Sequence, residues 1–202
     1  AYHFRKLHGD PRLVLDARHE DLTRALAGVK AVALELAGGG LQEAEKLLRE
    51  EGEGEALAAL VGRHRPTGSS SGNRNNTLGL PWEILSQRDS IENFVAEAGM
   101  SRPGELDALG RILRPIGVLL YTRIAPVHTE FFDGVDGIAR AKGELLPYLD
   151  PAGTLVINAA DPRQAAYAEA TGARVLRYGD GGDAAIERLE DRGLLGTSFD
   201  LV

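Results

Sequence analysis

The sequence predicts an α/β protein built on a mostly parallel sheet flanked by helices. Two short apolar runs, residues 116–121 and 154–157, are each long enough for one buried strand. Residues 135–149 lie between them and have the spacing of an amphipathic helix. A strand, a helix and a second strand in this order form one βαβ unit, in which the two strands are parallel.

Residues 1–66 are predicted to form a small α/β piece, which precedes a larger domain over residues 67–202. The strand and helix candidates in this N-terminal piece are residues 12–15, 31–36, 41–51 and 56–61. Turn residues separate these candidates, so the piece is expected to fold from short elements.

Composition and charge exclude several classes of protein. Hydrophobic residues make up 43% and charged residues 26%, which is usual for a soluble globular domain. The net charge of −7, without a basic run, argues against a nucleic-acid partner. The absence of cysteine excludes disulfides and thiolate metal sites. No apolar run reaches the length of a membrane span or has the form of a signal peptide, which predicts a cytoplasmic protein.

Polar side chains follow the predicted strands, at the sheet edge where parallel sheets bind ligands. His128 and Asn158 each come after one strand of the βαβ unit, so one crevice is expected to hold both. Glu97 lies in an earlier strand candidate, residues 93–100, which is expected beside the strand that precedes His128. Gly99 leaves room for a metal ion near this carboxylate. From the residues alone, Glu97 is equally an exposed acid, and His128 equally a hydrogen-bonded histidine.

Four stretches, in this order, resemble the central domain of the Mur ligases. They are GNRNNTLGLP at 72–81, VAEAGMSRPGE at 95–105, IAPVHTEFF at 124–132 with GIARAKGELL at 137–146, and VINAADPR at 156–163. Within that family the sequence is most similar to the ligases that add D-alanyl-D-alanine to UDP-N-acetylmuramoyl-tripeptide. The resemblance covers residues 67–202 and none of the first 66, and it identifies residues 67–202 as an incomplete central domain.

The resemblance implies an ATP-dependent amide ligase of peptidoglycan synthesis. ATP would phosphorylate the carboxylate of a UDP-MurNAc-peptide, and the amine of D-Ala-D-Ala, or of a similar amino acid or dipeptide, would attack the acyl phosphate. Phosphoryl transfer between two anions needs cations near the reacting groups. The implied cofactors are therefore ATP and Mg²⁺.

The resemblance also assigns a metal site and two catalytic residues. It implies that Glu97 and His128 bind Mg²⁺, although Mg²⁺ prefers oxygen ligands and chemistry alone would not select a histidine. It implies that Lys142 is carbamylated, which would turn a cation into a carboxylate-like group that supports the metal. Lys142 and His128 are the catalytic residues of this hypothesis.

The remaining site residues are assigned to the substrate and the nucleotide. By the resemblance, the substrate-binding residues are Asn73, Asn75 and Asn76, and the cofactor-binding residues are Thr67, Gly68, Asn158 and Asp161. Ala160 stands where the family has an aspartate, which weakens the assignment of the adenosine site.

The phosphate loop is shorter than the family pattern requires. Thr67 and Gly68 resemble the start of that loop, but the Gly-Lys-Thr and the helix that should follow are absent before Asn73. A loop without this lysine loses the charge that reaches the phosphates. Two alternatives remain open: a longer chain contains the missing residues, or the protein is a non-catalytic Mur-like binding or scaffold protein.

Overall fold

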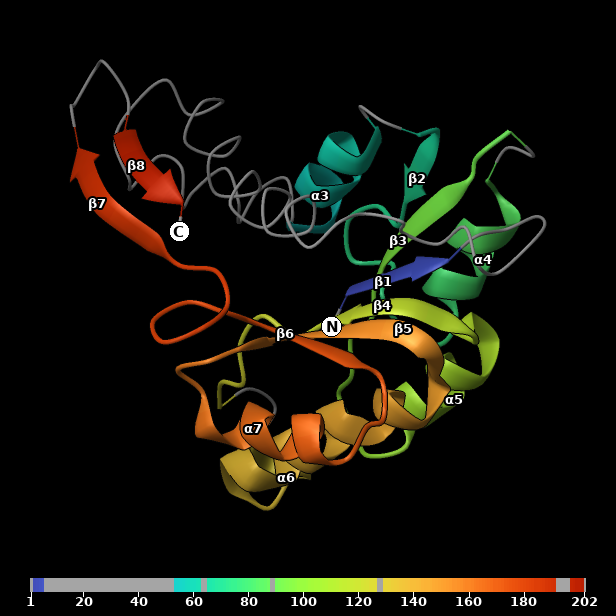
Figure 1. The fold of residues 1–202 in the computed structure, drawn as a ribbon. Helices are drawn as coiled ribbons and strands as arrows, with labels where there is room; N and C mark the ends of the chain where they lie inside the picture. Colours follow the sequence, from blue (N-terminus) through green and yellow to red (C-terminus); the bar gives the residue numbers. More distant parts are fainter. Residues whose placement is uncertain are drawn as a thin grey trace.

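The computed structural model describes residues 2–5, 53–62, 65–87, 90–126, 129–191 and 197–201. These residues form a six-stranded sheet in the order β2-β3-β1-β4-β5-β6 and a two-stranded sheet of β7 and β8 (Figure 1). The strands of the large sheet are β1 (Tyr2–Arg5), β2 (Thr67–Ser69), β3 (Asn93–Glu97), β4 (Ile116–Leu120), β5 (Leu149–Asn158) and β6 (Arg174–Tyr178). The small sheet consists of β7 (Ile186–Asp191) and β8 (Thr197–Leu201).

The large sheet is parallel except for β1. Strand β2 pairs parallel with β3, and β4, β5 and β6 are also parallel, whereas β1 is antiparallel to both β3 and β4. The predicted mostly parallel α/β sheet is therefore confirmed. The expectation that β3 lies beside β4 is wrong, because β1 separates them by two strand spacings, about 10 Å. No local pattern in a four-residue strand specifies partners so far along the chain.

Helices cover both faces of the large sheet (Figure 1). The α-helices are α3 (Glu53–Gly62), α4 (Gly79–Leu85), α5 (Glu105–Leu113), α6 (Gly134–Lys142) and α7 (Pro162–Glu169), and the 3₁₀ helices are η2 (Thr129–Phe131) and η3 (Gly143–Tyr148). Helix α3 packs on one face through Leu57 and Ala58, and α5, α6 and α7 cover the other. None of the helices in the described ranges is long and apolar enough to span a bilayer.

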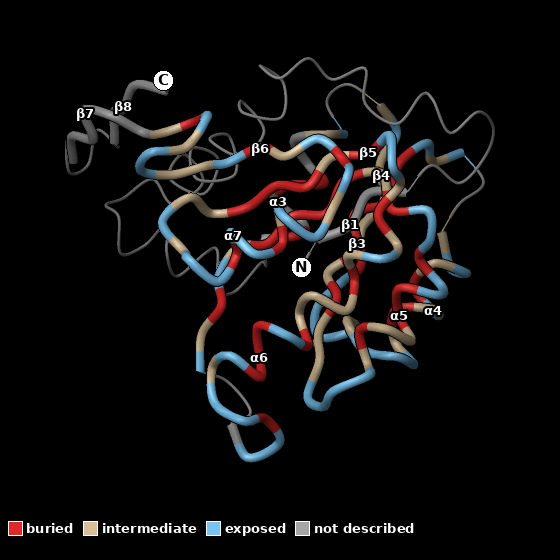
Figure 2. Tube along the Cα trace, turned by 60° about the horizontal axis from the view of Figure 1, so that its bottom comes forward, coloured by how far each residue is buried: buried red, intermediate tan, exposed pale blue. Residues whose placement is uncertain are grey.

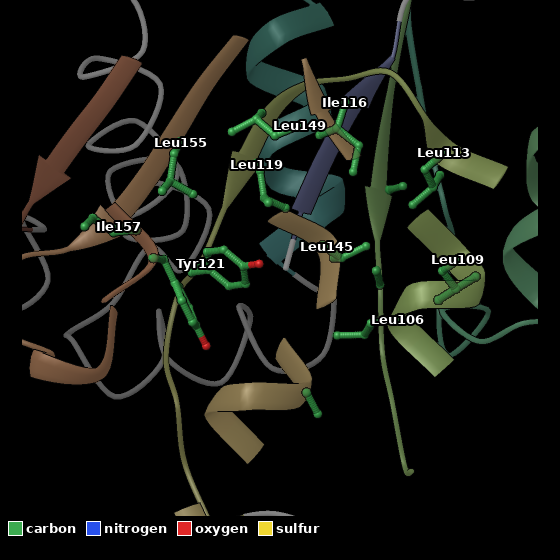
Figure 3. Close-up of a cluster of buried hydrophobic side chains, with 14 of the residues drawn as sticks. Leu106, Leu109, Leu113, Ile116, Leu119, Tyr121, Leu145, Leu149, Leu155 and Ile157 are labelled. Carbon is green, nitrogen blue, oxygen red and sulfur yellow. The ribbon is translucent and has the colours of Figure 1, made fainter. Parts of the chain in front are cut away.

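Successive residues of the central strands point into two different cores. Val118 and Leu120 of β4 belong to the cluster under α3, whereas Leu119 and Tyr121 belong to the larger cluster beneath α5 and α6 (Figure 3). The tube view shows that the central strands are buried along most of their length (Figure 2). Strands covered on both faces carry continuous apolar runs, which is the pattern that predicted them.

The helix predicted over residues 135–149 is shorter in the structure. Helix α6 ends at Lys142, the 3₁₀ helix η3 follows, and β5 already begins at Leu149. Pro147 lies inside η3 and has no backbone N–H, so it cannot continue an α-helical hydrogen-bond ladder. The apolar spacing alone did not indicate this change of helix type.

Two segments of the predicted N-terminal piece are built into the central sheet. Strand β1 is a middle strand of that sheet, and α3, which confirms the helix expected over residues 56–61, packs against it. The candidates at residues 12–15, 31–36 and 41–51 lie outside the described residues. The division at residue 66 stays a prediction, although β1 lies inside the sheet of the larger domain and α3 packs on it.

Helix α5 is joined to η3 by a carboxylate with two partners. The hydroxyl of Tyr148 donates to Oδ1 of Asp107 over 2.6 Å, and Arg111 donates to Oδ2 over 3.0 and 3.1 Å. The hydrogen bond from Tyr148, followed by that from Arg111, lowers the pKa of Asp107 below its ordinary value of 3.8. These bonds favour the charged carboxylate in the folded protein.

We expect this carboxylate to make unfolding depend on pH. Because the folded pKa of Asp107 is depressed, its stabilisation is present above the ordinary value of 3.8 and is lost as the pH falls through the folded pKa. Urea unfolding between about pH 2.5 and 6 measures this loss. As the pH falls, the free energy of unfolding of Asp107→Asn should decrease less steeply than that of the wild type. Asp180→Asn, a change in an exposed loop, should decrease as steeply as the wild type. Equal slopes for wild type and Asp107→Asn would contradict the prediction.

Candidate functional site

The carboxyl ends of the parallel strands lie along one edge of the sheet. Tyr2 of β1 is opposite both Glu97 of β3 and Leu120 of β4. Leu120 is paired with Val156 of β5, which is paired with Leu176 of β6. The loops that follow β3, β4, β5 and β6 therefore leave the sheet near the same level, and Glu97 and Asn158, the last residues of β3 and β5, lie at this edge.

Glu97 is held in place at the end of β3. Its backbone N–H donates to Oγ of Ser70 over 2.9 Å, and its Oε1 accepts a hydrogen bond from Nδ2 of Asn75 over 2.9 Å. Glu97 and Asn75 are both half-buried. A predicted metal ligand and a predicted substrate-binding residue are thus in direct contact.

Gly99 allows this contact. Its N–H donates to the carbonyl of Asn75 over 2.8 Å. A Cβ at residue 99 would lie 2.8 Å from Cγ of Asn75, closer than real Cβ contacts. The sequence predicted that Gly99 leaves space for a metal ion, whereas the structure shows that the space receives the Asn75 side chain. The loops that follow β2 and β3 are joined as a result.

A buried carboxylate that the sequence did not single out organises the same loop. Glu83 of α4 is only 6% exposed, and its Oε1 accepts hydrogen bonds from Ser71 and from Arg74. A buried carboxylate needs such partners, since burial without them is costly. Arg74 lies inside the GNRNN motif, but Glu83 lies beyond it, so only the fold identifies this pair.

The other two predicted substrate-binding asparagines have different surroundings. Oδ1 of Asn76 accepts from the N–H groups of Leu78 and Gly79 over 3.0 and 2.8 Å, and it thereby caps the start of α4. Asn73 is exposed at the tip of the loop. Asn73 and Asn76 are thus both exposed, whereas Asn75 is half-buried, and Asn76 has a structural role beside any substrate contact of its amide nitrogen.

Thr67 and Gly68 lie in strand β2 rather than in a loop. They pair with Asn93 and Phe94 of β3, and the Thr67 hydroxyl donates to the carbonyl of Arg65 over 2.8 Å. The chain passes from the end of β2 directly into the Asn-rich loop. A role of Thr67 and Gly68 in nucleotide binding stays a prediction.

Asn158 and Asp161 shape the turn between β5 and α7. Oδ1 of Asn158 accepts from the N–H of Ala160 over 2.9 Å, and Asp161 caps α7 by accepting from the N–H of Arg163 over 3.1 Å. The fully buried Gln164 accepts from the N–H of Asn158 and donates to Asp161. This turn presents Asn158 at the sheet edge, and among the described residues its Nδ2 has no hydrogen-bond partner.

Lys142 is the last residue of α6 and is half-buried. Its carbonyl accepts a hydrogen bond from the hydroxyl of Tyr121, just past the end of β4, over 2.8 Å. His128 lies outside the described residues, so its predicted contact with Glu97 stays a prediction. Over the described ranges, no three histidine, aspartate or glutamate side chains gather closely enough to hold a metal ion.

The residues at the end of β3 fit a Mg²⁺ ion by the chemistry of their donors. Mg²⁺ prefers carboxylate oxygens and retains several water ligands, so one protein carboxylate with an accessible oxygen is a suitable anchor. Oε1 of Glu97 is engaged by Asn75, and Oε2 accepts no hydrogen bond from the described residues. Asn75 would therefore orient the carboxylate and leave Oε2 for the ion.

We expect Asn75→Ala to weaken binding of a divalent cation. The loss of a partner that orients a metal ligand typically costs about 10- to 100-fold in affinity. Titration with Mn²⁺, followed by electron paramagnetic resonance, measures the affinity directly, and Thr77→Ala, an exposed change in the same loop, is the matched control. Equal Mn²⁺ affinities for Asn75→Ala and Thr77→Ala would remove the role proposed for Asn75.

The fold is that of an α/β domain with a mostly parallel sheet, a class that binds ligands at the carboxyl ends of its strands. The family model of the Mur ligase middle domain matches residues 42–199. Because this match spans more than half of the sequence, the chain belongs to the Mur ligase family. The match also begins earlier than residue 67, where the resemblance of the motifs was expected to start.

Two curated relatives with the same name are similar to this chain. A UDP-N-acetylmuramoyl-tripeptide–D-alanyl-D-alanine ligase of Mycobacterium leprae is 39% identical over 108 residues, which are 53% of this chain and 20% of that protein. The ligase of the same name from Bacillus subtilis is 33% identical over 106 residues, which are 52% of this chain and 23% of that protein. The chain thus spans between a fifth and a quarter of the length of these relatives.

Solved structures agree with this assignment of the fold. MurF from Acinetobacter baumannii has a TM-score of 0.62 at 30% identity, over 70% of this chain and 33% of that one. The MurF ligase of Thermotoga maritima in complex with ADP has a TM-score of 0.58 at 20% identity, over 98% of this chain and 47% of that one. The second likeness is one of fold alone.

Proposed function

We propose that this chain contains the ATP- and Mg²⁺-binding part of a ligase that makes a peptidoglycan precursor in the cytoplasm. The observation that carries the proposal is the Asn75–Glu97 hydrogen bond at the carboxyl edge of the sheet. It pairs a predicted metal ligand with the Asn-rich loop, inside the region that the Mur ligase model matches. In this proposal residues 67–202 contribute the central domain and residues 1–66 precede it.

The proposed reaction joins D-Ala-D-Ala to a UDP-MurNAc-tripeptide. The substrate carboxylate attacks the γ-phosphorus of ATP and ADP leaves, which gives an acyl phosphate. The amine of D-Ala-D-Ala then attacks the acyl carbon, and phosphate leaves as the amide forms. Mg²⁺ supplies positive charge that offsets the charge of the phosphates. Because the chain itself has a net charge of −7, this positive charge must be local.

Each predicted residue has a place in this proposal. Glu97 holds Mg²⁺ through Oε2, with Asn75 fixing its other oxygen, and His128 is a further metal ligand. Lys142, as its carbamate, provides negative charge on the same side of the reacting groups as these metal ligands. The substrate contacts are assigned to the amide groups of Asn73 and Asn76.

The nucleotide is assigned to the turn after β5. Nδ2 of Asn158 is an available donor for a base, and Asp161 follows in the same turn, although its oxygens already bond α7. Thr67 and Gly68 would bring backbone groups near the phosphates. Asn158 is therefore the stronger of the predicted nucleotide contacts.

One observation favours a second candidate, a Mur-like protein that binds without catalysis. No lysine occurs between Thr67 and Asn76, and β2 runs directly into the Asn-rich loop. Without that lysine, the γ-phosphate lacks its usual cationic partner. Such a protein would keep the Asn-rich loop and bind the UDP-sugar substrate alone.

Two measurements separate these candidates. The intact mass of the protein from its natural host should exceed 21.6 kDa if a longer chain contains the phosphate-loop lysine. Phosphate release that requires both UDP-MurNAc-tripeptide and D-Ala-D-Ala would then support the ligase. A mass of 21.6 kDa, binding of the UDP-sugar peptide and no phosphate release would support the non-catalytic candidate.

A further inference from the structure

Three of the five tyrosines in the chain form hydrogen bonds that connect the end of β6, the end of β4 and the end of helix α6. Tyr121 comes just after β4, Tyr167 lies on α7, and Tyr178 is the last residue of β6. Tyr121 and Tyr167 are only 1% and 6% exposed, and their ring centroids are 4.6 Å apart. We refer to Tyr121, Tyr167 and Tyr178 as the tyrosine clamp.

The hydroxyls of the clamp all donate to backbone carbonyls. Tyr121 donates to the carbonyl of Lys142 over 2.8 Å, and Tyr167 donates to the carbonyl of Ala139 over 2.5 Å. The last four carbonyls of a helix have no partner within the helix, so their position depends on groups from outside it. The Tyr121 hydroxyl is one such group, and it bonds the carbonyl of the last residue of α6, Lys142.

Tyr178 links the backbone just past β4 to the end of β6. Its hydroxyl donates to the carbonyls of Tyr121 and Thr122 over 3.0 and 2.7 Å. The backbone of Tyr121 is therefore held to the end of β6 while its side chain holds the end of α6. Figure 3 shows the Tyr121 ring beside the buried side chains of β4 and β5, with its hydroxyl directed out of the strand.

Gly143 completes the fit around the last turn. Its N–H donates to the carbonyls of Ala139 and Ala141, which closes the helix. A Cβ at this residue would lie 3.3 Å from the ring of Tyr167, so the aromatic ring packs directly against the helix end. The last turn of α6 thus has backbone, ring and hydroxyl contacts that leave little freedom at Lys142.

We infer that the tyrosine clamp positions Lys142, and that Tyr121 is its main positioning residue. The clamp sets where the backbone of Lys142 lies relative to the end of β4, and thereby limits where the lysine amine can reach. The use of Lys142 in catalysis rests on the proposed function, whereas the positioning itself rests on the hydrogen bonds described here. Tyr121 touches the Lys142 backbone and no reacting atom, so it acts through Lys142.

Chemical labelling tests the positioning without any catalytic activity. Tyr121→Phe removes only the hydroxyl, and Tyr148→Phe removes an equivalent hydroxyl that bonds Asp107 at the far end of η3. In the first variant the Lys142 carbonyl loses the hydrogen bond that links it to Tyr121 past the end of β4, so acetic anhydride should label the Lys142 amine about fivefold faster or more. Mass spectrometry of peptides gives the rate relative to the internal references Lys6, Lys30 and Lys46.

The outcomes of this labelling decide the inference. A faster rate at Lys142 alone, in Tyr121→Phe and not in Tyr148→Phe, supports positioning. Equal Lys142 rates in the two variants, or a rise at all four lysines in Tyr121→Phe, overturn it, because either result indicates only general loosening. Thermal unfolding of both variants verifies that each is folded at the labelling temperature.

Carbamate formation gives a second readout that depends on the proposed function. The neutral Lys142 amine attacks the carbon of CO₂, so that one N–C bond forms and one proton is released. With ¹³C-bicarbonate, the carbamate of Lys142 should give a resonance that is absent from Lys142→Ala. This resonance should appear only at a several-fold higher bicarbonate concentration in Tyr121→Phe than in Tyr148→Phe. Equal bicarbonate requirements would count against positioning. If the wild type has no such resonance, the catalytic role of Lys142 fails, and the labelling result alone decides whether the clamp positions it.

Discussion

Lys142→Ala should abolish ligase turnover in the complete natural protein. The carbamate proposed for Lys142 is an anion that helps to hold Mg²⁺ near the phosphates, and alanine cannot supply that charge. Loss of one such electrostatic group costs about 100- to 1,000-fold in rate. The measurement is phosphate release that depends on both UDP-MurNAc-tripeptide and D-Ala-D-Ala. Added acetate should restore part of the activity, because a small carboxylate can occupy the space left by the carbamate.

Arg140→Ala is the matched control for this experiment. Arg140 is an exposed cation on the same helix, two residues before Lys142, so Arg140→Ala also shortens a long side chain near the end of α6 but removes no proposed anion. The control should keep nearly full turnover. Full turnover in Lys142→Ala would show that this lysine is a surface charge only, and rescue by acetate in both variants would show a nonspecific salt effect.

Gly153→Ala should cause a large loss of stability. Gly153 is buried in β5, and a Cβ there would lie 2.6 Å from the carbonyl oxygen of Gly117 in β4 and 2.9 Å from that of Asp150. Both neighbours are backbone atoms, so the clash is relieved only if β4 moves away from β5 and the backbone of β5 itself shifts near Asp150. We expect a loss of about 3 kcal/mol in the free energy of unfolding, at the upper end of overpacking effects.

Gly172→Ala provides the comparison. No atom lies within 4 Å of the Cβ position at Gly172, and the residue is exposed. Its free energy of unfolding should change by no more than about 0.5 kcal/mol. Urea denaturation of both variants measures the difference. Equal stabilities would mean that β4 and β5 can separate near Gly117 and Gly153 without cost.

The local elements of the fold could be read from the sequence, whereas the long-range pairing could not. The apolar runs predicted β4 and β5 because strands buried on both faces are continuously apolar. Strand β1 has only four residues, and its partners Glu97 and Leu120 lie far along the chain. No periodic pattern encodes such a pairing, and its insertion separated two strands that were expected to be neighbours.

The candidate site was likewise predictable only in part from the sequence. Family motifs identified Glu97 and Asn75 separately, but only the folded chain shows that one orients the other. Glu83 and Tyr121 were not singled out, because a glutamate in a short helix and a tyrosine after a strand are common features of sequences. Their importance comes from burial and from partners that are distant in the chain, Arg74 and Lys142.

The antiparallel β1 also affects how the chain is made on the ribosome. It is the first of the described strands to be synthesised, yet Tyr2 finds its partners only at Glu97 and Leu120. At typical rates of translation, the segment waits on the order of 5–20 s before the first of these partners exists. Until then β1 has no strand to pair with, and it can join the two halves of the sheet only after β4 has also been made. The nascent chain therefore has an unpaired middle strand for much of its synthesis, which is the period when chaperones would protect it.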